Sequence, residues 1–227
     1  MKLRLGSFLM SFVLLISVFL GAAPVAKADS GMTISDQGIR VLKEFEGFSK
    51  YAYFDYSQWS IGYGTACNKD DYPNGITLEK ADELLRAYLV NLEKNLNRFA
   101  NNNNLNLSQQ QFDALVSFTY NVGSSWMYDN KQLITKTVLS GATGNDFIFA
   151  LGRWCIVTEN GVRKVSRGLI NRRMIEANMY LNGIYVNSVP SNYKYVIYED
   201  NIDSCITDTR VQAYDDNVND EIGRAHV

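Results

Sequence analysis

Residues 44–65, EFEGFSKYAYFDYSQWSIGYGT, are the stretch that decides the fold. Glu46 stands near its start, at the end of an amphipathic segment, and Asp55 follows nine residues later. Between Tyr51 and Gly64 the stretch is rich in aromatic residues and alternates in polarity, as a short twisted sheet does. A helix that leads directly into a small sheet is therefore predicted, with one carboxyl in each. Two carboxyls in contrasting environments are what cleavage of a glycosidic bond requires.

The segment before Glu46 has the signals of a helix. Ser35 is a suitable N-cap and Gly47 a suitable stop after the last turn. The apolar stripe consists of Ile39, Leu42 and Phe45. Glu46 stands four residues after Leu42 and so shares this face. Burial beside an apolar stripe disfavours the charged form of a carboxyl and raises its pKa, which suits a general acid.

The remainder of the domain reads as helices. Thr77 caps a long helix that continues to Phe99, and Ser108 with Gln111 forms the capping box of the next. Further helices are expected near residues 129–139, 146–154 and 166–181. Short strands followed by runs of helices indicate an α+β fold with two lobes, a small β lobe and a mainly helical lobe. The cleft between two such lobes is a usual site for an extended substrate.

Four regions follow from composition. Residues 1–28 have a basic start, an apolar run and the Ala26-Lys27-Ala28 cleavage pattern, so we interpret them as a signal peptide; a membrane anchor is the alternative. We expect residues 29–185 to form the catalytic domain. Residues 186–220 are rich in Asp and Asn, typical of an acidic linker or a truncated second module, with one possible strand in residues 193–198. Residues 221–227 resemble a sequencing artefact.

Charge and histidine content exclude several functions. Residues 29–185 carry 16 basic and 16 acidic side chains, so we expect no nucleic acid as a partner. The one histidine is His226, which argues against Cys-His, Ser-His-Asp and His-ligated zinc chemistry. The sequence has no metal or nucleotide motif, so neither a metal nor a cofactor is expected. We also expect a monomer.

Three cysteines in an exported chain suggest one disulfide and one further cysteine. Cys67 follows the predicted strands and Cys155 follows Arg153-Trp154. We predict a disulfide between these two, with Cys205 in the tail left over. The alternative is that all three are thiols.

The chain resembles the phage-type lysozymes, glycoside hydrolase family 24, over roughly residues 31–183. Five blocks carry the resemblance in order: Phe45-Glu46-Gly47 with Asp55, Trp59-Ser60-Ile61-Gly62-Tyr63-Gly64, Gly75-Ile76-Thr77, residues 111–123, and Arg153-Trp154 with residues 168–173. The resemblance implies a lysozyme-like fold. It also implies hydrolysis of the β-1,4 bond between N-acetylmuramic acid and N-acetylglucosamine in bacterial peptidoglycan.

Catalytic roles are carried over from this resemblance. Glu46 matches the family's general acid and Asp55 its second carboxylate. Ser60 matches a threonine that positions the attacking water. The chain departs from the family by having four, not five, residues between Asp55 and this hydroxyl, and by Thr65 where many members have histidine. The reaction is expected to invert the configuration of the sugar.

Four residues are expected to contact the sugars: Tyr63, Tyr120, Asn121 and Trp154. Core packing is the alternative for the three aromatic residues. Arg167 is a candidate to pair with Glu46 or to contact the glycan; the alternative is a solvated charge at the start of a helix.

The sequence thus predicts a secreted muramidase that acts on the cell wall. A lytic transglycosylase is the nearest enzymatic alternative, since such enzymes share lysozyme-like folds but need one carboxyl. A wall-binding module without activity is the alternative from another class, if the short Asp55–Ser60 loop has cost the enzyme its chemistry.

Overall fold

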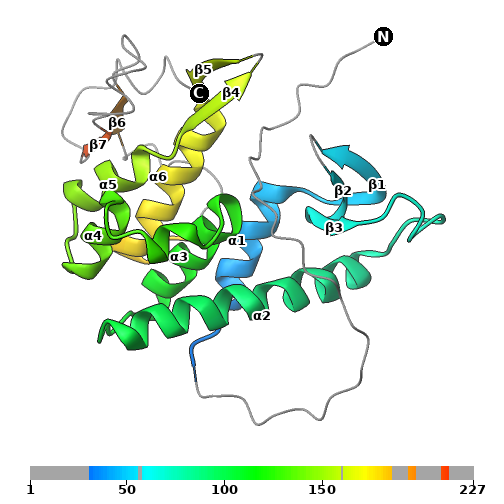
Figure 1. The fold of residues 1–227 in the computed structure, drawn as a ribbon, viewed down its shortest axis with the longest axis horizontal. Coiled ribbons are helices and arrows are strands. Elements are labelled where there is room, and N and C mark those ends of the chain that lie inside the picture. The colour runs from blue at the N-terminus through cyan, green and yellow to red at the C-terminus, as the bar shows by residue number, and fades with distance from the viewer. Residues whose placement is uncertain (1–30, 56–57, 160, 186–193, 198–210, 215–227) are drawn as a thin grey trace.

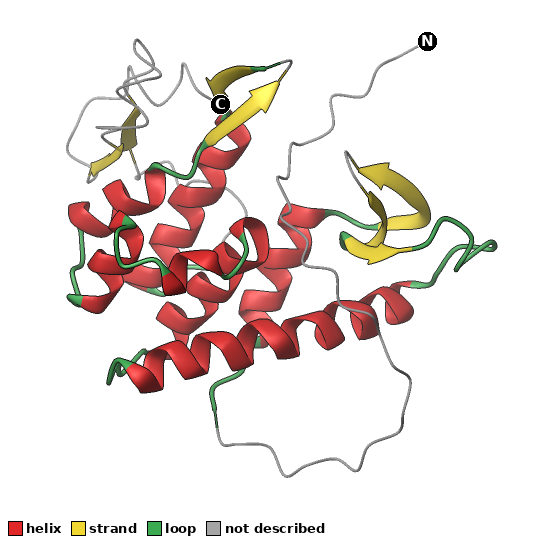
Figure 2. Cartoon of the chain, viewed as in Figure 1, coloured by secondary structure: helices red, strands yellow, loops and turns green. Residues whose placement is uncertain are grey.

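The computed structural model describes residues 31–55, 58–159, 161–185, 194–197 and 211–214. They form a small antiparallel sheet on one side and a group of helices on the other (Figures 1 and 2). The helices are α1 (Asp36–Glu46), α2 (Leu78–Asn102), α3 (Gln109–Val122), η1 (Ser125–Tyr128), α4 (Leu133–Leu139), α5 (Asn145–Gly152) and α6 (Arg167–Asn182). The strands are β1 (Ser49–Asp55), β2 (Gln58–Gly62), β3 (Thr65–Cys67), β4 (Ile156–Glu159), β5 (Val162–Val165), β6 (Lys194–Ile197) and β7 (Val211–Tyr214). The expected α+β arrangement with two lobes is confirmed.

Helix α1 begins and ends where its sequence signals place it. The Ser35 hydroxyl accepts a hydrogen bond from the Gly38 amide at 3.1 Å, so Ser35 is the N-cap. The helix ends at Gly47, which has φ +66°, and the Gly47 amide donates to the Lys43 carbonyl. This positive φ favours glycine because a Cβ would be strained there. The stop at Gly47 fixes Glu46 as the last residue of the helix.

The sheet follows α1 directly and has the strand order β1-β2-β3, all antiparallel. Asp55 stands opposite Gln58, Phe54 opposite Trp59, and Tyr53 opposite Ser60. An irregularity between Ser49 and Tyr53 shifts the register of β1. The sheet therefore presents Asp55 at the end of β1, opposite the first residue of β2.

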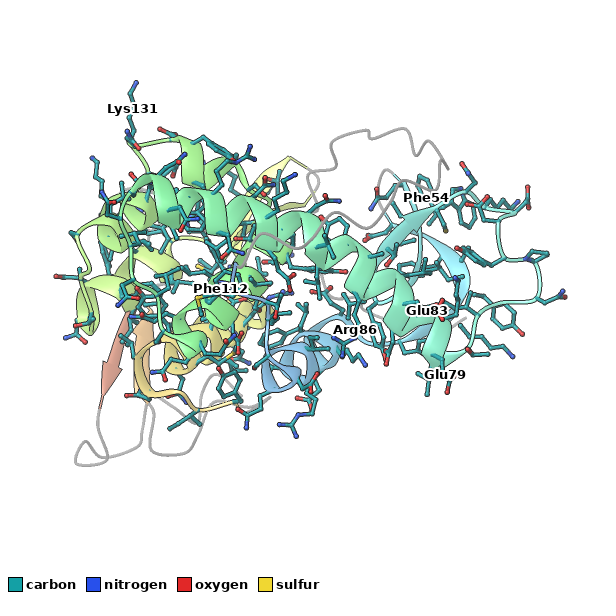
Figure 3. The ribbon with its side chains drawn as sticks, turned by 90° about the horizontal axis from the view of Figure 1, so that it is seen from below. Phe54, Glu79, Glu83, Arg86, Phe112 and Lys131 are labelled. Atoms are coloured by element: carbon teal, nitrogen blue, oxygen red, sulfur yellow. The ribbon has the colours of Figure 1, made fainter. Side chains whose placement is uncertain are left out.

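Helix α2 joins the two lobes. Thr77 caps it as predicted, and its side chain accepts from the Lys80 amide at 3.2 Å. Glu79 and Glu83 lie at the end beside the sheet, whereas Phe112 and Lys131 lie in the helical lobe (Figure 3). The buried face of α2 comprises Ala81, Leu85, Leu89, Leu92, Leu96, Phe99 and Ala100. One continuous apolar face thus serves the cores of both lobes.

The helical lobe packs around α3 and Trp126. The capping box of α3 is present, with Ser108 and Gln111 each bonded to the other's backbone. Trp126 is fully buried, its ring makes edge contacts with Phe99 and Phe118, and its indole N–H donates to Thr119 Oγ1 at 3.1 Å. Helix α6 packs against α3 and supplies the charged residues described below.

The helical lobe differs from the sequence prediction in the start of one helix and in the presence of a hairpin. The helix expected from residue 129 begins only at Leu133, because both carboxylate oxygens of Asp129 accept hydrogen bonds, from the Lys131 amide and the Gln132 side chain. These bonds stabilise a turn in place of helix. The β4–β5 hairpin was not predicted, and it places Ile156 opposite Val165.

The predicted disulfide between Cys67 and Cys155 is wrong. Both residues carry thiols and are not bonded to each other. Cys67 is the last residue of β3 in the small sheet, whereas Cys155 is buried in the helical lobe just before β4. A disulfide needs a Cβ–Cβ separation of about 3.5–4.5 Å, and these two residues form no such bond.

Strand β6 confirms the strand expected within residues 193–198, and it pairs with β7, which was not predicted. The expected signal peptide (1–28), Cys205 and the suspected artefact (221–227) lie outside the described residues. Across the part of the chain that the structure describes, no helix has the length and apolar character needed to span a membrane.

Candidate active site

Glu46 is a buried carboxyl at the end of α1. Its side chain is only 3 % exposed, and Oε1 accepts a charged hydrogen bond from Arg172 Nη1 at 2.7 Å. Burial raises the pKa of Glu46 above its ordinary value of 4.5, while the Arg172 guanidinium acts in the opposite direction. A carboxyl that holds its proton towards neutral pH can donate it to a leaving oxygen.

Arg172 belongs to a buried network of charges on α6. Its Nε contacts Glu176 Oε1 at 3.0 Å, and its Nη2 donates to the Ser117 carbonyl at 3.1 Å. The Ser117 hydroxyl also donates to Glu176 Oε1, at 2.8 Å. Arg173 Nη1 stands 3.2 Å from Glu176 Oε2. Buried charges are costly unless they are paired, and here two guanidinium groups and two carboxyls share one site.

The helical lobe and the sheet meet beside Glu46. The Tyr120 hydroxyl on α3 donates to the Tyr63 carbonyl at 2.7 Å, just after β2. Gly64 follows with φ +88°, a conformation that favours glycine. A Cβ on Gly64 would stand 3.9 Å from Glu46 Oε2 and 3.8 Å from the Tyr120 hydroxyl. Gly64 thus lies directly against the acid and keeps the space beside it clear.

Asp55 is the last residue of β1 and is half-buried. Burial raises its pKa above the ordinary value of 3.8. Ser60 on β2 is 1 % exposed, and its hydroxyl accepts from Gln58 Nε2 at 3.4 Å. Residues 56 and 57, between Asp55 and these groups, lie outside the described residues. The water-positioning role of Ser60 stays a prediction.

The pKa of Tyr53 on β1 is affected by both carboxyls. Burial is the largest cause that raises the pKa of Tyr53, and the negative charges of Asp55 and then Glu46 raise it further. Burial and the charge of Glu46 likewise raise the pKa of Tyr88 on α2 and, to a larger extent, that of Tyr120. The three phenols therefore remain neutral hydrogen-bonding groups near the acid across the pH range in which carboxyls titrate.

The four predicted sugar-binding residues lie in different surroundings. The Tyr63 side chain is buried, with Lys43 Nζ 5.3 Å from its ring centre. Tyr120 is half-buried, and its hydroxyl is used in the bond to Tyr63. Asn121 is buried, and its Oδ1 accepts a hydrogen bond from Arg173 Nη2. Contact of these three residues with substrate stays a prediction.

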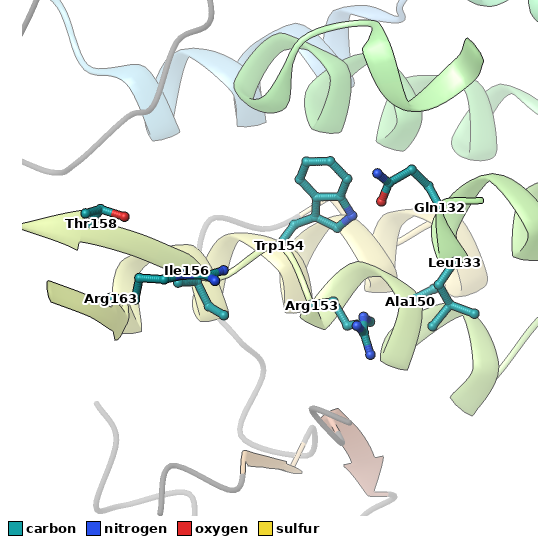
Figure 4. Close-up of a pocket in the computed structure, with 8 residues that line it drawn as sticks. All are labelled: Gln132, Leu133, Ala150, Arg153, Trp154, Ile156, Thr158 and Arg163. Carbon is teal, nitrogen blue, oxygen red and sulfur yellow. The ribbon is translucent and has the colours of Figure 1, made fainter. Parts of the chain in front are cut away.

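Trp154 is the fourth of these residues, and its ring makes an edge contact with that of Phe118, the ring centres being 5.6 Å apart. Trp154 also lines a pocket of about 430 Å³ (Figure 4). Arg153, Arg163, Gln132 and Thr158 give this pocket its polar groups. Its lining does not include Glu46 or Asp55. A role of Trp154 in binding would therefore concern a part of the substrate away from the bond that is cleaved.

Sequence reasoning missed Arg172, Glu176 and Tyr53. Arg172, rather than the candidate Arg167, is the cation that contacts Glu46. A signal was present, because Arg172-Arg173 and Glu176 lie in a helix whose other central residues are nearly all uncharged. Charged residues with i, i+3 and i, i+4 spacing in such a helix point to buried pairs.

The raised pKa of Glu46 predicts a pH dependence of stability. The folded state binds the Glu46 proton more tightly than the unfolded state does, so this contribution is complete below pH 4.5 and is lost as the pH rises through the raised pKa. The free energy of unfolding of Glu46→Gln, minus that of the unmodified protein, should therefore increase from about pH 4.5 upwards. Urea unfolding of both proteins at several pH values measures this difference. A difference that decreases with pH would mean that Arg172 outweighs burial.

The small sheet beside a helical lobe, with a buried carboxyl at the end of the first helix and a second at the end of β1, defines a two-lobed, lysozyme-like protein. Residues 43–176 match the family model of phage lysozyme, and the chain belongs to that family. The matched region of this chain includes Glu46, Asp55, Ser60 and Arg172.

Individual relatives agree with this assignment. The chain is 33% identical over 156 residues to the endolysin of Bacillus phage B103, covering 67% of this chain and 55% of that relative. It thus spans about half the length of that protein. An endolysin structure from Escherichia coli O157:H7 phage FAHEc1 is 33% identical with a TM-score of 0.61, covering 68% of this chain and 97% of that one. The muramidase domain of SpmX from Asticaccaulis excentricus is 31% identical with a TM-score of 0.57, covering 66% and 98%.

Proposed function

We propose that this chain is a peptidoglycan hydrolase, a muramidase that cleaves the β-1,4 bond between N-acetylmuramic acid and N-acetylglucosamine. The observation that carries the proposal is the buried Glu46 carboxyl, with its raised pKa, held by Arg172 at the junction of the two lobes. The endolysin and muramidase relatives support the same substrate class.

In the proposed reaction Glu46 donates its proton to the glycosidic oxygen as the bond from that oxygen to the sugar carbon breaks. Asp55 stabilises the positive charge that develops on the sugar and accepts a proton from the attacking water. Ser60 orients this water on the opposite face of the ring. The outcome is inversion, for which the two carboxyls must leave room for the water, about 6.5–9.5 Å apart.

We also propose that residues 1–28 direct export, so that the domain acts on the cell wall outside the membrane. The protein acts as a monomer and requires no cofactor in this proposal. Sedimentation of the purified protein measures its oligomeric state. Digestion of peptidoglycan in the presence of a chelator tests whether a metal is required.

Digestion of purified peptidoglycan, followed by mass spectrometry of the released fragments, tests the function. Fragments with reducing N-acetylmuramic acid ends are expected, and proton NMR at early times should show the inverted anomer. Fragments with 1,6-anhydro ends would identify a lytic transglycosylase. Sedimentation with peptidoglycan but no release of fragments would identify a wall-binding module without activity.

A further inference from the structure

One guanidinium, that of Arg172, is shared between two buried carboxyls. Nη1 contacts Glu46 at 2.7 Å and Nε contacts Glu176 at 3.0 Å, and the third nitrogen donates to the Ser117 carbonyl. The Arg172 side chain is 5 % exposed and that of Glu176 is fully buried. Since the planar fork of an arginine is rigid, anchoring two of its nitrogens fixes the direction of the third. The position of Glu46 therefore depends on Glu176 through Arg172.

Glu176 also faces a second positive charge. Arg173 is fully buried, with Nη1 3.2 Å from Glu176 Oε2 and its guanidinium 4.9 Å from the centre of the Phe118 ring. Nε and Nη1 of Arg173 have no hydrogen-bond acceptor, so its charge is incompletely satisfied. Burial accordingly lowers the pKa of Arg173 to about 10, against the charge of Glu176, which raises it.

We propose that Glu176 is a positioning residue for the reaction. It holds Arg172 against Glu46, and its negative charge offsets the positive charge of Arg173. The net charge of the α6 residues beside Glu46 is therefore +1 and not +2. Without Glu176, both guanidinium groups would favour the ionised form of Glu46, and the acid would lose its proton at a lower pH. The proposal rests on the proposed function, because it explains how the proposed proton donor stays protonated.

Other charged and titratable groups around Glu46 do not replace this role. Besides the three α6 residues, they are Tyr120 on α3, Tyr88 on α2 and Tyr53 on β1. The pKa of each tyrosine is raised by burial, so these phenols are neutral when Glu46 titrates. The charge of Asp55 acts on Tyr53 as that of Glu46 does. The titrations are therefore repeated in an Asp55→Asn background, where the same shifts of the Glu46 midpoint are expected.

The test is a carbon-13 NMR titration of the Glu46 carboxyl in the full chain, assigned by its absence in Glu46→Gln. In Glu176→Gln the titration midpoint of Glu46 should fall by about one pH unit or more. The high-pH limit of peptidoglycan clearing should fall with it. In the double variant Glu176→Gln/Arg173→Gln one charge of each sign is removed, and the midpoint should return towards that of the unmodified protein.

An unchanged Glu46 midpoint in Glu176→Gln would overturn the proposal, as would a double variant shifted as far as the single one. If Glu176→Gln does not fold, as judged by circular dichroism, Arg173→Gln alone is measured; there the midpoint should rise, and a fall or no change would overturn the proposal. The NMR midpoint does not depend on clearing, so an inactive protein would contradict the proposed function and leave this test valid.

Discussion

Replacement of Glu46 by Gln is expected to lower the rate of peptidoglycan clearing by about 10²–10⁴-fold. Glutamine has the shape of glutamate, and its side-chain oxygen can still accept the hydrogen bond that Arg172 Nη1 makes at 2.7 Å. It carries no acidic proton, so the leaving oxygen would depart as an alkoxide. Initial clearing rates, normalised to protein concentration, measure the effect.

Glu44→Gln is the matched control, because Glu44 lies on the same helix two residues earlier and is exposed. We expect it to clear peptidoglycan at the rate of the unmodified protein. Both variants should sediment with peptidoglycan, since neither change alters the four residues expected to contact the sugars. Retention of more than about a tenth of the activity by Glu46→Gln would remove Glu46 from the role of general acid, given the usual contribution of such a group.

The local parts of the fold could be predicted because their signals are local. Ser35, Thr77 and Ser108 each cap a helix whose N–H groups would otherwise lack acceptors, and Gly47 stops α1. The β4–β5 hairpin was missed although Asn160-Gly161 stands between two β-branched runs, a sequence typical of a hairpin turn. The sequence prediction assigns no element to residues 155–165, between the helices expected near residues 146–154 and 166–181.

The candidate site was predicted in part, since its members depend on contacts of different range. Glu46 and Asp55 lie nine residues apart, within one helix–strand unit, so their placement follows from the chain itself. The bond from Arg172 to Glu46 spans 126 residues, and no local pattern indicates which of two adjacent arginines turns towards the acid. The packing of α6 against α3 decides it, because Ser117 and Glu176 hold Arg172 from both helices.

The disulfide prediction failed for a related reason. Counting cysteines gives the number of possible pairs but not their separation, and Cys67 and Cys155 belong to different lobes.

The burial of Glu46, in contrast, could be predicted from the sequence pattern alone. The apolar stripe of α1 predicted a desolvated carboxyl, and the raised pKa of Glu46 has burial as its largest cause.

Replacement of Asp55 by Asn is expected to lower clearing by about 10²–10³-fold, through loss of the negative charge that stabilises the developing cation and accepts the proton of the water. Asparagine is nearly the same size, and Asp55 is half-buried at the end of β1. The folded state should therefore keep its stability. At neutral pH it should even gain slightly, because burial raises the pKa of Asp55 and disfavours its charge.

Asp70→Asn is the control for this change, since Asp70 is an exposed acid that follows the same sheet. Initial clearing rates and urea unfolding are measured for both variants. Loss of clearing in Asp55→Asn with an unchanged free energy of unfolding would show that Asp55 acts in the reaction itself. Equal losses of clearing in Asp55→Asn and Asp70→Asn would instead assign the effect to the net charge of the lobe. Activity retained in Asp55→Asn but lost in Glu46→Gln, with anhydro ends on the fragments, would mean that one carboxyl is sufficient. The reaction would then be that of a transglycosylase, in which a hydroxyl of the sugar itself replaces the water that Asp55 is proposed to activate.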